Sequence, residues 1–338
     1  MTPLFLNLLN SVNRPRAPQH LILDSISNSE KLKMSRAFTD NTNCFNVSNT
    51  IVFTTADDGP KILAWLSPLD PQVQHQDICS QRVDSIGDWL LETKEFRDWY
   101  SGTEEGFDHA ALFCYGDPGV GKSYIRYARP PVKEKQRALL LTGRDGSSVV
   151  IDHLCDQAIE RDMAVACFYY DFASREAQSP TNMLGSLLKQ VLRGLGEIPV
   201  EIVQKFQNQN KVIGGRRLQL PDIVKMFATV QTPQRTFICV DALDECVPEH
   251  QLEVLEALGQ ILQASPKTRV FMTGRSHIRG AVERRLGGKA TCVPIKPRDR
   301  DVVTYLRARL RKDTTPEVMN SRLEGDIMKS IPKENSES

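Results

Sequence analysis

Eight consecutive residues form a pattern suited to binding phosphate. Gly116–Ser123 reads Gly-Asp-Pro-Gly-Val-Gly-Lys-Ser, which matches G-x-x-x-x-G-K-[ST] and directly follows the apolar run Ala110–Tyr115. Glycines let the backbone turn so that successive N–H groups point at a phosphate, and the helix that follows adds partial positive charge at its N-terminus. Lys122 would bridge the β- and γ-phosphates, and the Ser123 hydroxyl would bind Mg²⁺. The residues predicted to contact nucleotide here are Gly116, Gly119, Val120, Gly121, Lys122 and Ser123.

A group of three acidic residues follows a second apolar run. Asp241 comes directly after Phe237–Val240, at a strand end where its carboxylate would lie beside the phosphates. We therefore predict Asp241 as a ligand of Mg²⁺, either direct or through water. Asp244 and Glu245 come just past it and are placed to orient and activate water. The alternative is that the three acids form a solvated loop or the first turn of a helix.

A basic residue ends a third run. Arg275 follows Thr268–Thr273, so its guanidinium would emerge at the same edge of the sheet and could sense or neutralise the γ-phosphate. The alternative is a surface arginine beside a turn. His277 and Arg279, two and four residues later, are weaker candidates, since a lone histidine is more often structural than catalytic.

Short apolar runs alternate with helical patterns from about residue 109 onward. Runs this short, continuous and rich in β-branched or aromatic residues are typical of parallel strands covered on both faces. Ser179-Pro180 supplies a helix N-cap and a first-turn proline, and Ser265-Pro266 ends another helical pattern. The sequence predicts an α/β sheet with ligands at the carboxyl ends of its strands. The expected strands are Ala110–Tyr115, Ala164–Tyr170, Thr236–Val240, Thr268–Thr273 and Ala290–Ile295.

The 338 residues divide into three parts. Residues 1–60 are predicted to be a loosely ordered, disordered leader, because the first 50 contain eight Asn and six Ser with little periodic apolar pattern. Residues 61–108 are predicted to form a small helical adaptor that holds all three tryptophans. Residues 109–338 would form the P-loop NTPase domain, with an atypical insertion at 126–147.

Composition excludes several classes of protein. The formal net charge is only +1, which argues against a strong field for nucleic acid or anionic lipid, so we expect no nucleic-acid partner. The eight cysteines form no C-x-x-C pairs, and Cys114, Cys167 and Cys239 lie inside apolar strand-like runs. We therefore predict reduced, buried thiols in a cytoplasmic protein. No run of about 18 apolar residues occurs, so we expect no membrane-spanning segment.

The segment from Trp65 to Pro332 closely resembles a fungal NACHT domain, a signal-transducing P-loop ATPase of the NOD-like receptor type. The resemblance implies that Asp241 handles Mg²⁺, that Asp244 and Glu245 belong to an extended second motif, and that Arg275 is the sensor. It also implies that residues near Arg82 line the base and ribose pocket. The motifs that carry it are Trp65–Asp70, Arg82–Asp84, Gly87–Leu91, Gly116–Ser123, Ser179–Leu187, Asp241–Cys246 and Thr273–Arg275.

Two departures from that family stand out. Residues 126–147 carry six basic and two acidic residues, and Pro130-Pro131 cannot continue the helix after the phosphate loop. This insertion is either unspliced intron sequence, or an error in the gene model, or a regulatory loop. The chain also stops at Ser338, before the winged helix and repeats that the resemblance leads one to expect.

These observations predict a nucleotide-binding NACHT-type regulatory NTPase that binds ATP with Mg²⁺ and hydrolyses it slowly at most. GTP stays open, although the guanine-reading pattern N-K-x-D is absent, since Asn210-Lys211 precedes Val212-Ile213. The expected partners are nucleotide and a second copy or a related NACHT protein. The alternatives are a truncated, non-hydrolysing scaffold fragment and a small-molecule kinase. The kinase is disfavoured because the basic insertion, its only lid candidate, directly follows the phosphate loop.

Overall fold

The computed structural model describes residues 58–72, 75, 86–102, 109–116, 146–161, 163–195, 197–211, 218–230, 235–296, 298–311, 325–326 and 328. All of them belong to one compact unit, Val52–Ser338, and residues Met1–Ile51 form a separate unit outside this description. The predicted leader, apart from residues 58–60, and residues 126–145 of the insertion also lie outside the described residues.

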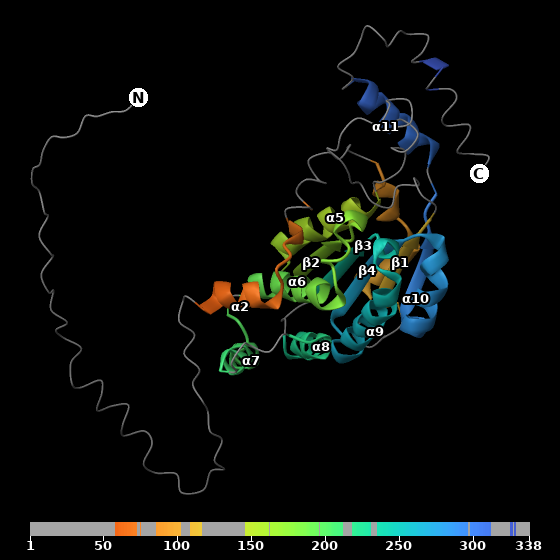
Figure 1. The fold of residues 1–338 in the computed structure, drawn as a ribbon. Coiled ribbons are helices and arrows are strands. Elements are labelled where there is room, and N and C mark those ends of the chain that lie inside the picture. Colours follow the sequence, from red (N-terminus) through yellow and green to blue (C-terminus); the bar gives the residue numbers. More distant parts are fainter. Residues whose placement is uncertain are drawn as a thin grey trace, which may run out of the picture. The chain divides into compact units, whose positions relative to one another are not determined.

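A five-stranded parallel sheet forms the centre of the described unit (Figure 1). Its strands run in the spatial order β2-β3-β4-β1-β5, so β4 separates β3 from β1. Each strand lies within about one residue of its predicted position, and the predicted α/β fold of a P-loop NTPase is confirmed. The strands are β1 (Ala111–Tyr115), β2 (Ala164–Tyr169), β3 (Thr236–Asp241), β4 (Thr268–Gly274) and β5 (Ala290–Pro294).

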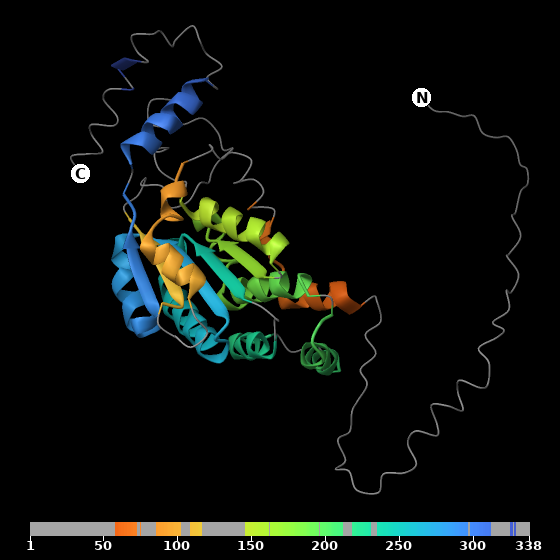
Figure 2. The same ribbon diagram turned by 180° about the vertical axis from the view of Figure 1, so that it is seen from behind.

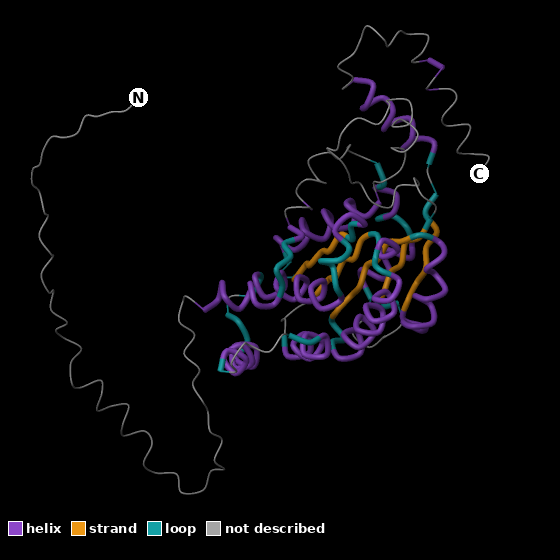
Figure 3. Tube along the Cα trace, in the orientation of Figure 1, coloured by secondary structure: helices purple, strands orange, loops and turns teal. Residues whose placement is uncertain are grey.

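Helices cover both faces of the sheet, with the strands between the two layers in the tube view (Figure 3). One face packs against α6 (Pro180–Arg193), α8 (Leu220–Thr229), α9 (Pro248–Ala264) and α10 (Arg279–Leu286). The opposite face, seen in Figure 2, packs against α4 (Lys94–Ser101) and α5 (Gly146–Glu160). This double cover explains why the strands are apolar throughout rather than alternating.

Local signals account for where these helices begin. The Ser179 hydroxyl accepts the Asn182 N–H, and Pro180 occupies the first turn, as the sequence predicted for α6. Thr93 caps α4 in the same way by accepting the Phe96 N–H. α9 begins at Pro248, and it ends at Ala264, just before Ser265 and Pro266.

The segment predicted as an adaptor contributes to the cores on both faces of the sheet. Trp99 of α4 is fully buried, with its ring centroid 5.4 Å from that of Phe237 on β3. On the other face, Ile62 and Leu66 of α2 (Asp58–Leu66) join the core beside α6. α7 (Val200–Asn210) lies next to α2, and α11 (Asp299–Arg311) follows the last strand. These helices therefore belong to the same compact unit as the sheet.

The predicted burial of thiols in the strands is confirmed. Cys114, Cys167 and Cys239 are buried and free. Burial raises the pKa of Cys239 well above its usual value, so this thiol stays protonated. Among the helices in the described ranges, none has both the length and the apolar character needed to cross a membrane.

Candidate functional site

The carboxyl ends of β1, β3 and β4 bring the predicted site residues to one edge of the sheet. β1 is followed by Gly116, whose N–H donates to the carbonyl oxygen of Gly274 at the end of β4 (3.3 Å). Asp241 ends β3, on the other side of β4. The first residue of the phosphate-loop motif and the predicted magnesium ligand are therefore both neighbours of β4. The remaining predicted contacts, Gly119, Val120, Gly121, Lys122, Ser123 and Arg82, lie outside the described residues.

The Asp241 carboxylate is held by Thr273, which belongs to the Thr273–Arg275 motif but was not predicted to be a site residue. Asp241 is only 1% exposed, and the Thr273 hydroxyl donates to its Oδ1 at 2.5 Å. Thr273 Oγ1 in turn accepts the N–H of Ala242 at 3.0 Å. The signal that could have found Thr273 is a hydroxyl side chain at the carboxyl end of an otherwise apolar, buried strand. A buried carboxylate fixed by a hydroxyl offers the oxygen donor that a hard divalent cation such as Mg²⁺ prefers.

The chain turns sharply directly after Asp241. Ala242 has φ 53° and ψ 47°, a left-handed conformation that residues other than glycine rarely adopt. Such a conformation costs about 1–3 kcal/mol and persists only where surrounding contacts enforce it. Here the Ala242 N–H is bound by Thr273, and its carbonyl accepts the Glu245 N–H at 2.8 Å. The turn starts the short helix η4 (Leu243–Glu245), which contains the two later acids.

The predicted acid Asp244 and the predicted sensor Arg275 are brought together. Arg275 donates its backbone N–H to Asp244 Oδ1 (3.1 Å) and its Nε to Oδ2 (2.9 Å). The Asp244 side chain is 7% exposed, whereas that of Arg275 is half-exposed. Both carboxylate oxygens of Asp244 are thus engaged by Arg275. Asp244 therefore fixes the position of Arg275 at the end of β4, and its predicted role in activating water stays a prediction.

Glu245 reaches toward the neighbouring strand. Its Oε2 accepts the backbone N–H of Phe172 (3.0 Å), which begins the short helix η3 (Phe172–Ser174) after β2. The carbonyl of Asp241 accepts the Tyr170 N–H at 3.0 Å in the same region. The end of β2 is therefore tied to the acidic segment after β3 by contacts from both Asp241 and Glu245.

Arg279, a weaker candidate on sequence grounds, lies beside the start of the phosphate-loop motif. Its guanidinium carbon is 5.0 Å from the centroid of the Tyr115 ring, and it donates to the Tyr115 hydroxyl at 2.8 Å. Tyr115 is the last residue of β1 and directly precedes Gly116. Hydrogen bonding to Glu283 raises the pKa of Arg279 further, so its charge is constant over the accessible pH range.

The strand order and the Gly116–Ser123 motif define a P-loop NTPase fold, a class of nucleotide-binding modules. The family model described as Nephrocystin 3, N-terminal, matches residues 85–128 and 132–275, which is more than half of the chain. The protein belongs to this family. A comparison with curated proteins found no match.

A search of solved structures found similar chains at low sequence identity. Cdc6p from Pyrobaculum aerophilum matches at 12% identity over 72% of this chain and 54% of that chain, with a TM-score of 0.41. The Walker-type ATPase PABY2304 of Pyrococcus abyssi matches at 15% identity over 74% of this chain and 64% of that one, with a TM-score of 0.39. Drosophila ORC bound to DNA matches at 14% identity over 81% of this chain and 55% of that chain, with a TM-score of 0.37. The chain spans less than two thirds of the length of each.

The expectation that nucleic acid is excluded as a partner was wrong. It is contradicted by the structural similarity to chains such as Drosophila ORC, whose structure contains DNA. The physical error lies in using net charge, because +1 is a sum over the whole chain and says nothing of where the charges lie.

Proposed function

We propose that this protein is a nucleotide-binding, NACHT-type regulatory NTPase that takes ATP or GTP together with Mg²⁺. The observation that carries the proposal is the buried Asp241 carboxylate, held by Thr273 at the same sheet edge from which the Gly116–Ser123 motif begins. A carboxylate fixed in this way suits a metal that bridges phosphates, and the motif supplies donors for the phosphates themselves.

Each residue has a proposed task in that site. Backbone groups of Gly116–Gly121 and the Lys122 ammonium would bind the phosphates, and Arg82 would lie near the base and ribose. Mg²⁺, when bound, would neutralise charge on the β- and γ-phosphates, held by Ser123 and Asp241. Asp244 would hold Arg275 at the edge of the site, where the half-exposed guanidinium can meet a γ-phosphate.

Hydrolysis in this site would be slow. Asp244 and Glu245 are the predicted activators of water. Arg275 contacts both carboxylate oxygens of Asp244, and the Phe172 N–H donates to one carboxylate oxygen of Glu245. A general base must reach the proton that it removes. The Phe172 contact involves only Oε2 of Glu245, so Glu245 is the better candidate of the two.

The wider role is proposed from the resemblance of Trp65–Pro332 to fungal NACHT domains. On this basis the protein would act in the cytoplasm as part of a NOD-like signalling system, and nucleotide would control assembly with a second copy or a related NACHT protein. A non-hydrolysing scaffold fragment is the alternative function. The engaged state of Asp244 favours that alternative over rapid turnover.

Titration calorimetry with MgATP and MgGTP tests the proposal. Lys122→Ala should lower nucleotide affinity at least tenfold, or about 1.4 kcal/mol, because a cation that faces two phosphates is lost. The control is Lys61→Ala, which removes an exposed lysine of α2 and should leave affinity unchanged. Equal affinity of the Lys122 variant and the parent would refute the phosphate-loop assignment. Phosphate release by the parent then separates a slow NTPase from a scaffold.

A further inference from the structure

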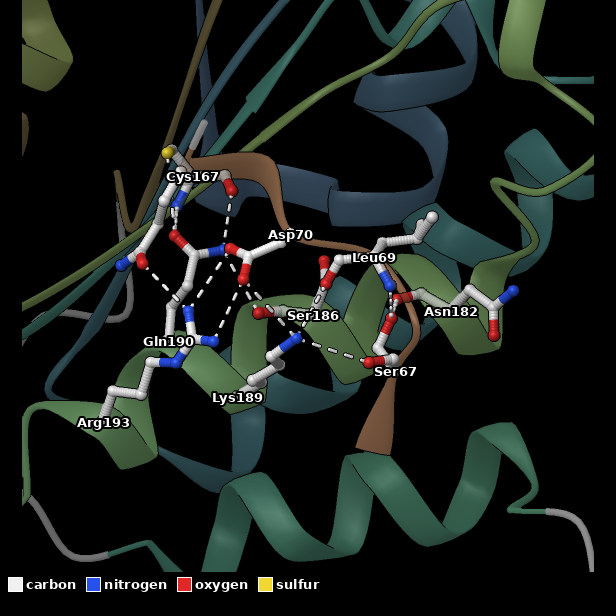
Figure 4. Close-up of polar contacts among 10 residues, drawn as sticks. Ser67, Leu69, Asp70, Cys167, Asn182, Ser186, Lys189, Gln190 and Arg193 are labelled. Atoms are coloured by element: carbon white, nitrogen blue, oxygen red, sulfur yellow. Dashed lines mark hydrogen bonds and ion pairs between the residues drawn. The ribbon is translucent and has the colours of Figure 1, made fainter. Parts of the chain in front are cut away.

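Two sequence motifs that the proposed site does not use meet on one helix. The segment Ser67–Asp70, which we call the clasp, follows α2 and lies along α6 (Figure 4). The two segments are more than a hundred residues apart in the sequence. The contacts of α6 therefore link the clasp to the sheet.

Side chains and main-chain groups hold the clasp on α6. Ser67 Oγ donates to the Asn182 carbonyl (2.8 Å) and accepts the Leu69 N–H (3.1 Å). Lys189, only 7% exposed, donates to the carbonyls of Ser67 (3.5 Å) and Leu69 (3.1 Å). Both carbonyl groups belong to the clasp, so the clasp covers this lysine and accepts hydrogen bonds from its ammonium group.

Ion pairs complete the attachment. Arg193 donates to both oxygens of Asp70, at 3.3 and 3.0 Å, and Lys189 Nζ lies 3.8 Å from Asp70 Oδ2. Hydrogen bonding to Arg193 is the main cause that lowers the pKa of Asp70 below its ordinary value. At neutral pH the clasp therefore presents a fixed negative charge to two cations of α6.

A neighbouring stripe of α6 holds the outer edge of β2. Gln190 accepts the Cys167 N–H (3.0 Å) and donates to the Cys167 carbonyl (2.8 Å). Among the described residues β2 is an edge strand, and this one amide pairs with its main chain as a neighbouring strand would. Gln178, just before α6, accepts the Asp171 N–H (2.9 Å) and donates to the Tyr169 carbonyl (3.2 Å). The position of β2 thus depends on where α6 lies.

β2 in turn contacts the candidate site directly. Tyr169 pairs with Asp241 in the parallel register, and the Tyr170 N–H donates to the Asp241 carbonyl at 3.0 Å. A continuous set of contacts therefore runs from Asp70 through Lys189 and Gln190 to β2 and Asp241.

We propose that the clasp is a positioning element for the candidate nucleotide site: it fixes α6, α6 fixes the outer edge of β2, and β2 holds the main chain at Asp241. Loss of the contact between the clasp and α6 weakens nucleotide binding, and bound nucleotide strengthens that contact by the same factor. The nucleotide part of this proposal rests on the proposed function, whereas the part that concerns Asp241 does not.

The test uses two variants of the clasp contact in the full chain. Lys189→Met removes the buried cation at similar length, and Asp70→Asn removes the partner charge without changing its shape. Asp222→Asn is the matched control, because it removes one charge of the Lys205–Asp222 ion pair (2.5 Å), which joins α7 to α8 rather than the clasp to α6. Asp70→Glu keeps the charge and is the conservative variant.

Amide hydrogen exchange and calorimetry with MgATP are the two measurements. We expect exchange at the Tyr170 and Ala242 amides to accelerate at least tenfold in Lys189→Met and at least threefold in Asp70→Asn. MgATP affinity should fall at least threefold in both. Asp222→Asn and Asp70→Glu should match the parent. The Val270 amide, bound to the Ala110 carbonyl in the same sheet (2.9 Å), is the internal reference and should change little.

Each outcome decides a separate point. Parent-like exchange at Tyr170 and Ala242 in both clasp variants would overturn the proposal, and so would equal acceleration at Val270, which signals general loss of stability. If the parent binds no nucleotide, the proposed function fails, and the exchange data still decide whether the clasp positions Asp241. If Lys189→Met does not fold, Asp70→Asn, whose side chain is partly exposed, gives the answer.

Discussion

Gly185 of α6 permits an approach between two helices that no other residue allows. A Cβ built on Gly185 would lie 2.1 Å from the Leu66 carbonyl oxygen and 3.1 Å from its carbonyl carbon. Both atoms are backbone, so no side chain can turn aside to make room. Gly185→Ala must therefore displace the end of α2 by about 1 Å, or release α2 from α6, because real side chains do not approach oxygen so closely.

The energetic cost follows from comparing these two responses. Overpacking that moves backbone costs about 1–3 kcal/mol, and a shift of this size belongs at the upper end. Release of α2 would expose Ile62 and Leu66, each fully buried, at about 1.5–3 kcal/mol apiece. The shift is the cheaper response. Alanine regains about 1 kcal/mol of helix propensity over glycine, so we expect a net loss of about 2 kcal/mol.

Urea unfolding of Gly185→Ala and Gly259→Ala measures this difference. Gly259 lies inside α9, and its added Cβ would meet ordinary contacts at 3.5 and 3.7 Å, so the same substitution should stabilise by about 0.5–1 kcal/mol. The helix-propensity gain is common to both variants, which leaves the contact with Leu66 as the difference. If Gly185→Ala is as stable as the parent, the conclusion that α2 packs closely on α6 at Gly185 is refuted.

Three further predictions concern the clasp and the candidate site. The pKa of Asp70 is lowered below 3.8 in the folded protein, so the ionised Asp70 carboxylate contributes fully to stability above about pH 4. This contribution is lost as the pH falls through the pKa of Asp70 in the folded protein. The urea midpoint of Asp70→Asn should therefore fall less steeply with decreasing pH than that of the parent. Thr273→Val should cost about 1–3 kcal/mol in urea unfolding and reduce the Mg²⁺ dependence of nucleotide binding, since the Asp241 carboxylate loses its buried donor, whereas Thr273→Ser should preserve both. Asp244→Asn should leave the Kd for MgATP within about twofold but slow phosphate release, because Arg275 loses its charged partner; unchanged release would contradict this role.

The sequence by itself determined the strands and the start of the site. Parallel strands covered on both faces are continuous apolar runs, so Ala111–Tyr115 and Thr236–Asp241 could be found without knowing their neighbours. The residue that follows such a run must lie at the carboxyl edge of the sheet. This reasoning placed Gly116 and Asp241 at one edge, and the roles of Lys122 and Ser123 stay predictions.

The tertiary structure decided which residues contact one another at that edge. The sequence does not reveal that β4 lies between β1 and β3, and this order is what brings Thr273 to the Asp241 carboxylate. It also pairs Asp244 with Arg275, two residues that local reasoning had assigned separate tasks.

Contacts between distant segments depend on the tertiary structure for the same reason. The sequence shows Ser67–Asp70 and α6 as two separate segments. That they pack together is seen only in the structure, in the close approach at Gly185 and the burial of Lys189. Local patterns report how one segment buries its apolar side chains, because that depends on its own periodicity. Which segments pack against one another depends on packing over the whole chain, and no local sequence pattern contains that information.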